Sequence, residues 1–200
     1  FLSRLENHFG LYLALTGRAV GPADAYRLRL ISHYIPAAHF HVIKDAVSDN
    51  HPIDRLLDGL HRDPGEGELA KLTPAIHRIF GAPSVEEILD RLDTERGQDE
   101  AWAKATAADI RKKSPTSLKV AFAQMRRGKS LGLADALRLE FKLASQLIAR
   151  PDYGEGVKSR IMGKGSEPLW SPATLSEVDD AEIESLFAKA PYGQLELEHN

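Results

Sequence analysis

Apolar positions spaced three and four residues apart run through the segment from Ser114 to Lys164 and predict three consecutive helices. Ser114 can cap the first helix, and Pro115 suits its first position because an N–H there has no helical partner. The predicted inner face of this helix consists of Leu118, Ala121, Phe122 and Met125. Gly128 is expected to end it, with Ser130 as the cap of the next helix.

The second helix of this segment carries an apolar stripe and is expected to stop before Pro151, which disfavours helical backbone in the preceding residue. The stripe consists of Leu133, Leu137, Phe141, Ala144 and Ile148. Asp152 and Glu155 then predict a capping box for the third helix, with Val157 and Ile161 buried. The three helices are predicted to be scaffold, since they contain no obvious catalytic group.

The remaining chain also shows mostly helical spacing. A face from Leu2 to Thr16 ends at Gly17, and Gly21-Pro22 opens a short helix. Further helices are expected over 40–47 and 53–60, from Thr73-Pro74, from the Ser84/Glu87 capping box, around Trp102, Ala105 and Ile110, and from Asp179 to Phe187. Trp170 falls in an irregular arm between helices.

One segment, Ile31–Ile35, reads as a strand closed by Pro36. A lone strand cannot satisfy its own backbone groups, so its partner is expected to come from elsewhere. The residues alone therefore predict a mainly α chain with at most one or two short strands.

Composition changes this picture little. A chain of 200 residues with 42% apolar and 28% charged residues can form an ordinary globular domain. The absence of cysteine excludes disulfides, thiolate nucleophiles and zinc–sulfur sites. No apolar run approaches a membrane span, and a net charge of −3 gives no general attraction to nucleic acid. The start at Phe1, within a structured segment, predicts a processed or truncated protein.

Candidate chemistry is sparse. His39-Phe40-His41 could chelate a metal, but no third ligand follows from spacing, so no metal site is predicted. Glu140 lies near the buried stripe and is the best isolated candidate for a functional carboxylate, although a helix-flank carboxylate paired with Lys or Arg is the commoner case. Arg126, Arg127 and Lys129 cluster at a helix end, which the helix dipole explains as well as a phosphate partner does. The residues alone indicate a helical domain that needs a partner.

Several segments, in the correct order, resemble the crotonase superfamily. The match consists of Gly10–Gly17, Ala23–Pro36, Ser114–Lys119, Leu133–Arg150 and Asp152–Val157. Within the superfamily the chain is most similar to 3-hydroxyisobutyryl-CoA hydrolases. Two features favour these over plain enoyl-CoA hydratases: a long helical insertion that contains Ser84–Leu89, and the arm Pro168–Pro172 with a further helix beyond it.

The resemblance implies the C-terminal helical portion of a crotonase-like ββα-spiral fold. Its segments would be 1–36 at the end of the core, the insertion 37–113, the subdomain 114–165, and the arm, last helix and tail 166–200. The family's oxyanion-binding N–H groups and catalytic carboxylates lie upstream, so no catalytic residue is expected here. Arg160 and Lys164 occupy plausible positions for the adenylate end of coenzyme A, although relatives place an aromatic residue near Arg160. No metal or redox cofactor is implied, and CoA enters as part of the substrate.

Three functions remain open. In the first, the chain is part of a thioester hydrolase that acts in valine degradation, and the chain alone is inactive. The second is part of an enoyl-CoA hydratase or isomerase, and the third is a non-catalytic helical interaction module. The expected partners are the acyl-CoA substrate and the upstream half of the same protein, with neither nucleic acid nor membrane, and a homo-oligomer is left open. A cytoplasmic location is expected, or the mitochondrial matrix in a eukaryote.

Overall fold

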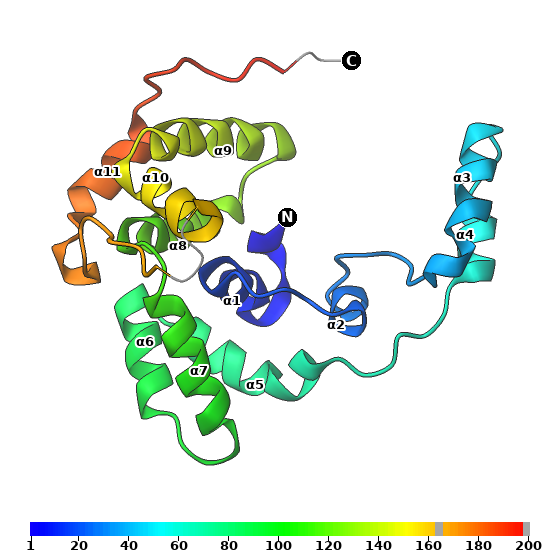
Figure 1. The fold of residues 1–200 in the computed structure, drawn as a ribbon, viewed down its shortest axis with the longest axis horizontal. Coiled ribbons are helices and arrows are strands. Elements are labelled where there is room, and N and C mark those ends of the chain that lie inside the picture. The colour runs from blue at the N-terminus through cyan, green and yellow to red at the C-terminus, as the bar shows by residue number, and fades with distance from the viewer. Residues whose placement is uncertain (163–165, 198–200) are drawn as a thin grey trace. The chain divides into compact units, whose positions relative to one another are not determined.

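The computed structural model describes residues 1–162 and 166–197, and in these residues every regular element is a helix (Figure 1). The prediction of a mainly α chain is therefore confirmed. Two compact units are present, one formed by 1–17 with 75–200 and one by Arg18–Pro74. Each unit is described by itself. The four segments predicted from the resemblance do not follow this division and stay a prediction.

Helix α1 (Phe9–Thr16) is the centre of the first unit, and seven of its eight residues are buried. It contacts the short 3-10 helix η1 (Leu2–Arg4) and, further along the chain, α7 and α8. The sequence predicted one continuous helix from Leu2, but the helix is interrupted. Asn7 and His8 adopt left-handed backbone with φ of 53° and 61°, so only the short 3-10 helix η2 (Glu6–His8) lies between η1 and α1. Gly17 ends α1 as predicted, its N–H donating to the Leu13 carbonyl at 2.9 Å.

Helix α5 (Glu68–Phe80) begins earlier than the sequence predicts. Pro74 was expected at its start but lies inside it, where a proline removes one backbone donor. The Thr73 hydroxyl donates at 2.8 Å to the Ala70 carbonyl, which is the acceptor that a residue 74 N–H would have used. The side chain of Thr73 thus lets the helix continue through the proline.

Helices α6 (Val85–Thr94) and α7 (Glu100–Arg111) pack side by side, joined by η4 (Gly97–Asp99) (Figure 1). Ser84 caps α6 as predicted by accepting the Glu87 N–H at 3.1 Å, but the Glu87 carboxylate pairs with Arg91 and does not complete a capping box. On α7, Ile110 is buried as predicted, whereas Ala105 is exposed and Ala103, Thr106 and Ala107 are buried in its place.

The last part of the unit contains α8 (Pro115–Gly128), α9 (Leu133–Ile148), α10 (Pro151–Val157), the π-helix η5 (Lys158–Met162), η6 (Leu175–Glu177) and α11 (Asp180–Ala188). Ser114 caps α8, with Pro115 in its first turn, as predicted. Ser130 does not cap α9. Its hydroxyl donates to the Arg127 carbonyl at 3.2 Å, and Gly132 is the N-cap.

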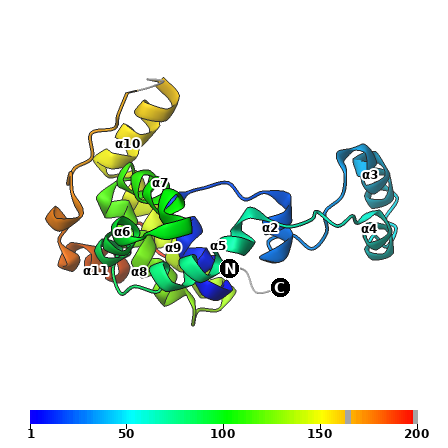
Figure 2. The same ribbon diagram turned by 90° about the horizontal axis from the view of Figure 1, so that it is seen from below.

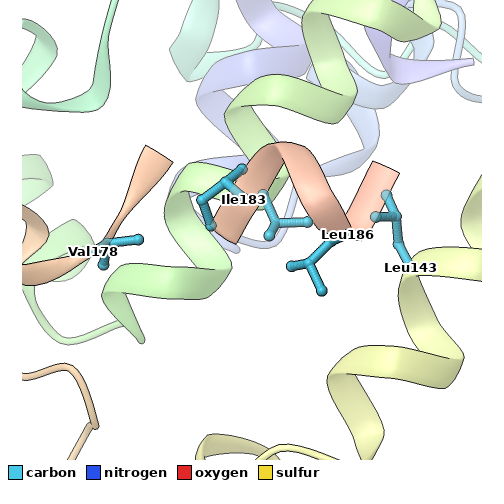
Figure 3. Close-up of a cluster of buried hydrophobic side chains, with 5 residues drawn as sticks. Leu143, Val178, Ile183 and Leu186 are labelled. Carbon is cyan, nitrogen blue, oxygen red and sulfur yellow. The ribbon is translucent and has the colours of Figure 1, made fainter. Parts of the chain in front are cut away.

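A small apolar cluster joins α8, α9 and α11, with Leu143 of α9 beside Leu186 of α11 (Figure 3). The buried members are Val120, Leu143, Val178, Ile183 and Leu186, and Leu139, Leu147 and Phe187 pack against them. The inner face of α9 is therefore Leu139, Leu143 and Leu147. The prediction that the other apolar stripe of α9 is buried is wrong. Its members are all exposed, namely Leu133, Leu137, Phe141, Ala144 and Ile148.

The second unit contains α2 (Pro22–Arg27), η3 (Ala37–His39), α3 (Phe40–Ser48) and α4 (Asp54–Leu60). The predicted strand Ile31–Ile35 does not form. The Tyr34 N–H donates to His61 Nδ1 at 3.0 Å, and the Tyr34 carbonyl accepts the Arg62 N–H at 2.9 Å. Both backbone groups of Tyr34 are therefore hydrogen-bonded without a sheet. Asp24 is buried and accepts the Leu69 N–H at 3.1 Å.

Candidate functional site

A cavity of about 1040 Å³ lies in the first unit between the end of α7, the start of α8, α10 with η5, and the arm that follows. Figure 2 shows α10 at the edge of this unit, with the arm leading back from it towards α11. The residues used below are Lys112, Lys113, Thr116, Asp152, Tyr153, Gly156, Val157, Arg160, Ile161 and Trp170.

Asp152 fastens the arm to the start of α8. One of its carboxylate oxygens accepts the Ser114 hydroxyl at 2.5 Å, and the other accepts the Ser171 N–H at 2.8 Å. The capping box predicted for Asp152 and Glu155 is therefore wrong. Arg150 is the N-cap of α10, and the Glu155 carboxylate accepts the Leu169 N–H at 3.2 Å.

Trp170 forms one wall of the cavity. Its indole Nε1 donates to the Lys112 carbonyl at 3.1 Å, which ties the arm to the C-terminal end of α7. Gly156 on α10 lies beside the ring, and a Cβ added there would make an ordinary contact, 3.5 Å from Trp170 Cη2. Three hydrogen bonds, from Leu169, Trp170 and Ser171, thus hold the arm in place.

Two kinds of basic residue line the cavity. Arg111 forms a bidentate pair with Asp93 at 2.5 and 3.0 Å, and its hydrogen bond lowers the pKa of that carboxyl. Arg150 pairs likewise with Glu182 at 2.5 Å. Among the described residues, Lys112, Lys113 and Arg160 have no carboxylate partner. These three cations are therefore available to a ligand.

Apolar side chains lie beside these cations. Tyr153, Val157 and Ile161 are four residues apart and exposed, Ile161 at 72%. The prediction that Val157 and Ile161 are buried is wrong, because no element of the described chain covers this face. Thr116 is only 3% exposed, and its hydroxyl has no hydrogen-bond partner among the described residues. Asp109 and Glu167 also line the cavity, so its charge is mixed.

Arg160 lies in η5, exposed and lining the cavity, where the resemblance placed the adenylate end of CoA. Lys164 falls outside the described residues. Lys112, Lys113 and Trp170 were not assigned to the site from the sequence. The helix dipole alone accounts for basic residues at the C-terminal end of α7, and only the indole bond to the Lys112 carbonyl brings the arm beside them.

The other candidates from the sequence lie elsewhere. Glu140 is exposed on α9. Arg127 pairs with Glu184 at 2.6 Å and its guanidinium lies 3.8 Å from the centre of the Phe187 ring, beside a second cavity of about 890 Å³. No group of three or more His, Asp or Glu side chains in the described chain is arranged to hold a metal ion. None of its helices combines the length and apolar character needed to cross a membrane.

The lining of the cavity combines cationic, apolar and acidic side chains. No histidine is among the described residues that line it, and the Asp152 carboxylate is engaged by two donors. An elongated ligand with an aromatic or apolar part and several negative charges fits Trp170, the α10 face and the three cations.

Known proteins similar to this chain share its fold and much of its sequence. The chain is 31% identical over 195 residues to the mitochondrial 3-hydroxyisobutyryl-CoA hydrolase of Dictyostelium discoideum, covering 94% of this chain and 51% of that protein. The corresponding protein of Danio rerio is 32% identical over 207 residues, covering 98% and 53%. The chain thus spans about half the length of the curated relatives it matches.

A solved carnitinyl-CoA dehydratase from Mycobacterium thermoresistibile superposes with a TM-score of 0.85 at 29% identity, covering 96% of this chain and 54% of that one. An enoyl-CoA hydratase from Rhodobacter sphaeroides gives 0.83 at 26% identity, with 98% and 56% covered. The family model for enoyl-CoA hydratase/isomerase matches residues 1–187. The resemblance to the crotonase superfamily is confirmed, and the chain belongs to the enoyl-CoA hydratase/isomerase family.

Proposed function

We propose that this chain is the C-terminal part of a CoA-thioester hydrolase of the 3-hydroxyisobutyryl-CoA hydrolase type, and that it has no activity alone. The observation that carries the proposal is the similarity to two such hydrolases over nearly the whole chain but only half of each relative. The reaction would be hydrolysis of a short 3-hydroxyacyl-CoA in valine degradation. Its compartment would be the cytoplasm, or the mitochondrial matrix in a eukaryote, and both relatives are named as mitochondrial proteins.

In this proposal the reacting groups lie in the other half of the complete protein. Paired backbone N–H groups would stabilise the oxyanion, an interaction typically worth 10²–10³ in rate, and a carboxylate would direct the water. No metal or redox cofactor takes part. The chain described here would contribute to binding the far end of the substrate and to positioning the thioester.

The cavity beside Trp170 is the proposed site for the nucleotide end of CoA. The adenine would lie against the exposed apolar face of Tyr153, Val157 and Ile161. The phosphates would contact Arg160 and Lys112, with Lys164 a further cation in the same proposal. Multiply charged phosphates are bound most strongly by guanidinium and ammonium groups that have no competing carboxylate.

The hydrolase assignment is tested with a chimera in which this chain replaces the matched part of the D. discoideum hydrolase. We expect the chimera to hydrolyse 3-hydroxyisobutyryl-CoA, and the 200-residue chain alone to leave it intact. Hydrolysis by the chain alone would contradict the proposal, as would a folded chimera that binds CoA but hydrolyses no thioester.

The nucleotide site is tested by titrating the chain with CoA and with pantetheine, which lacks the nucleotide. Because Arg160 is exposed, Arg160→Ala should weaken CoA binding by only about three- to tenfold and leave pantetheine binding unchanged. Arg55→Ala, at an exposed arginine of α4 with no ion pair in the described chain, is the matched control. Equal affinity of Arg160→Ala and the unsubstituted chain would exclude this site.

Part of an enoyl-CoA hydratase or isomerase is the second candidate, favoured by the two solved structures that superpose closely. The same chimera separates the two candidates: hydration of crotonyl-CoA in preference to hydrolysis of 3-hydroxyisobutyryl-CoA would favour the hydratase. The third candidate, a non-catalytic helical module, requires that the cellular product has the 22.1 kDa mass of this chain. Intact mass spectrometry of that product decides it.

A further inference from the structure

The second cavity, of about 890 Å³, lies in the first unit between the end of α8, α9, the end of α11 and residues 193–194 of the tail. Among the described residues it shares no lining residue with the cavity beside Trp170. A volume of this size is typical of sites for small molecules. Neither the thioester chemistry nor the CoA binding proposed above uses this second cavity.

Two cations on α9 line the second cavity. Arg138 and Lys142 are four residues apart, so their side chains project from the same face of the helix. Lys142 has no carboxylate partner among the described residues, and one of its three N–H groups donates to the Phe187 carbonyl at 3.1 Å. Arg138 donates to Asp135 at 3.0 Å, and an ion pair this exposed contributes little. Both cations can therefore bind a further anion.

The third cation of the cavity is already neutralised. Arg127 donates from Nη2 to both oxygens of Glu184 at 2.6 Å, and its guanidinium lies 3.8 Å from the centre of the Phe187 ring. The described lining thus contains three cations, Arg127, Arg138 and Lys142, against the two carboxylates of Asp135 and Glu184. One positive charge is left without a counter-charge, and it belongs to α9.

Apolar side chains complete the lining, namely Leu131, Leu139, Phe187 and Ala188. We propose that the second cavity binds an organic monocarboxylate with a short apolar body, its carboxylate on Lys142 and Arg138 and its body against Leu139 and Phe187. A single carboxylate matches the one unbalanced charge, whereas a phosphate ester carries up to two negative charges at neutral pH. This site goes beyond the proposed hydrolase assignment and does not rest on it.

Calorimetric titration of the chain with hexanoate tests the site. Hexanamide is the uncharged probe of equal size, and inorganic phosphate is the anion without an apolar body. We expect saturable binding of one hexanoate, with hexanamide bound about tenfold more weakly and phosphate more weakly than hexanoate. Absence of hexanoate binding overturns the proposal, as does hexanamide that binds equally well or phosphate that binds more tightly.

The charge is tested with Lys142→Gln, which should weaken hexanoate binding about five- to tenfold and leave hexanamide binding unchanged. Lys142→Arg keeps the charge and should restore hexanoate binding, and Lys71→Gln, at an exposed lysine of α5, is the matched control. Melting temperatures accompany these titrations, because Lys142 also donates to the Phe187 carbonyl. A folded Lys142→Gln that binds hexanoate as tightly as the unsubstituted chain overturns the proposal.

The location is tested with Ala188→Trp, which fills the cavity from an exposed position at the end of α11 without changing any charge. It should weaken hexanoate and hexanamide alike, by about tenfold or more, so a purely electrostatic effect is distinguished from loss of the cavity. Unchanged hexanoate binding in Ala188→Trp would place the ligand elsewhere and overturn the proposal.

Competition separates the two cavities of the first unit. CoA should not displace hexanoate, and Arg160→Ala should bind hexanoate as the unsubstituted chain does. Displacement by CoA that Arg160→Ala abolishes would locate hexanoate in the cavity beside Trp170 and overturn the proposal. So would hexanoate binding that is present in the chain but absent from the folded D. discoideum chimera, because the second cavity would then be filled in the complete protein.

Discussion

Helices α1 and α9 are both rich in apolar residues, yet they are buried to very different extents. Seven of the eight residues of α1 are buried, whereas Leu143 is the only fully buried residue of the sixteen in α9. The neighbours of α1, namely η1, α7 and α8, all belong to this chain. On its outer face α9 meets no described element. Apolar spacing therefore predicts that a face will be covered, but it does not say which polypeptide covers it.

The largest expected contrast comes from the same truncation in both helices. Leu15 is 1% exposed, so Leu15→Ala should lower the free energy of unfolding by about 2–5 kcal/mol through lost burial and a residual cavity. Leu133→Ala on α9 should change it by no more than about 0.5 kcal/mol. Urea unfolding of both variants measures the difference. Equal losses would show that Leu133 is covered within this chain.

Replacing one glycine by alanine in each region should change the free energy of unfolding in opposite directions. A Cβ at Gly10 would lie 1.8 Å from the Leu2 carbonyl oxygen, so Gly10→Ala should destabilise the chain by about 1–3 kcal/mol or more. Outside the local helix backbone, no atom of the described residues lies within 4 Å of a Cβ at Gly154 in α10, where alanine should add about 0.5–1 kcal/mol through helix propensity. Thermal unfolding tests both, and a tolerated Gly10→Ala would contradict the close approach of η1 to α1.

Helix caps give a smaller contrast. Ser114 caps α8 and also donates to Asp152, so Ser114→Ala should cost about 1–2 kcal/mol. Gly132 caps α9 with extended backbone and open space around it, so Gly132→Ser should add a few tenths of a kcal/mol at most. Chemical denaturation can measure the loss expected for Ser114→Ala. An unchanged free energy of unfolding would show that neither hydrogen bond of Ser114 stabilises the fold.

The smallest expected effect is on the pH dependence of the free energy of unfolding. Burial lowers the pKa of His8 below its usual 6.5, and the charges of His77 and Lys129 lower it further. Because the unfolded chain then binds a proton more readily than the folded chain, stability should rise with pH between the folded pKa of His8 and 6.5. His8→Asn keeps a residue that tolerates φ of 61° and should flatten this rise.

His51→Asn, at an exposed histidine, is the matched control substitution for this measurement. Stability measured from pH 5 to 8 in both variants compares them. An identical slope in His8→Asn and the unsubstituted chain would exclude His8 as the source.

Local signals in the sequence predicted the fold well. Ser84, Ser114 and Asp179 cap the helices assigned to them, and Gly17 ends α1. These signals act within a few residues, so no tertiary information is needed to interpret them. Pro74 shows the limit of such reasoning, because the Thr73 hydroxyl compensates for the missing N–H and the helix starts six residues earlier.

Long-range features could not be predicted in this way. Which face of α9 is buried depends on α11, more than thirty residues later in the chain. The site depends on bonds between Trp170 and Lys112 and between Asp152 and Ser114, which no spacing rule connects. Arg160 was assigned from the resemblance, and its role in binding CoA stays a prediction.

The most direct test of the whole account is reconstitution in two pieces. The purified chain would be added in increasing amounts to the part of the D. discoideum hydrolase that it does not match, and 3-hydroxyisobutyryl-CoA hydrolysis followed. We predict no hydrolysis by either piece and hydrolysis that rises to saturation in the mixture. Hydrolysis by the chain alone, or a mixture that associates and stays inactive, would contradict the account.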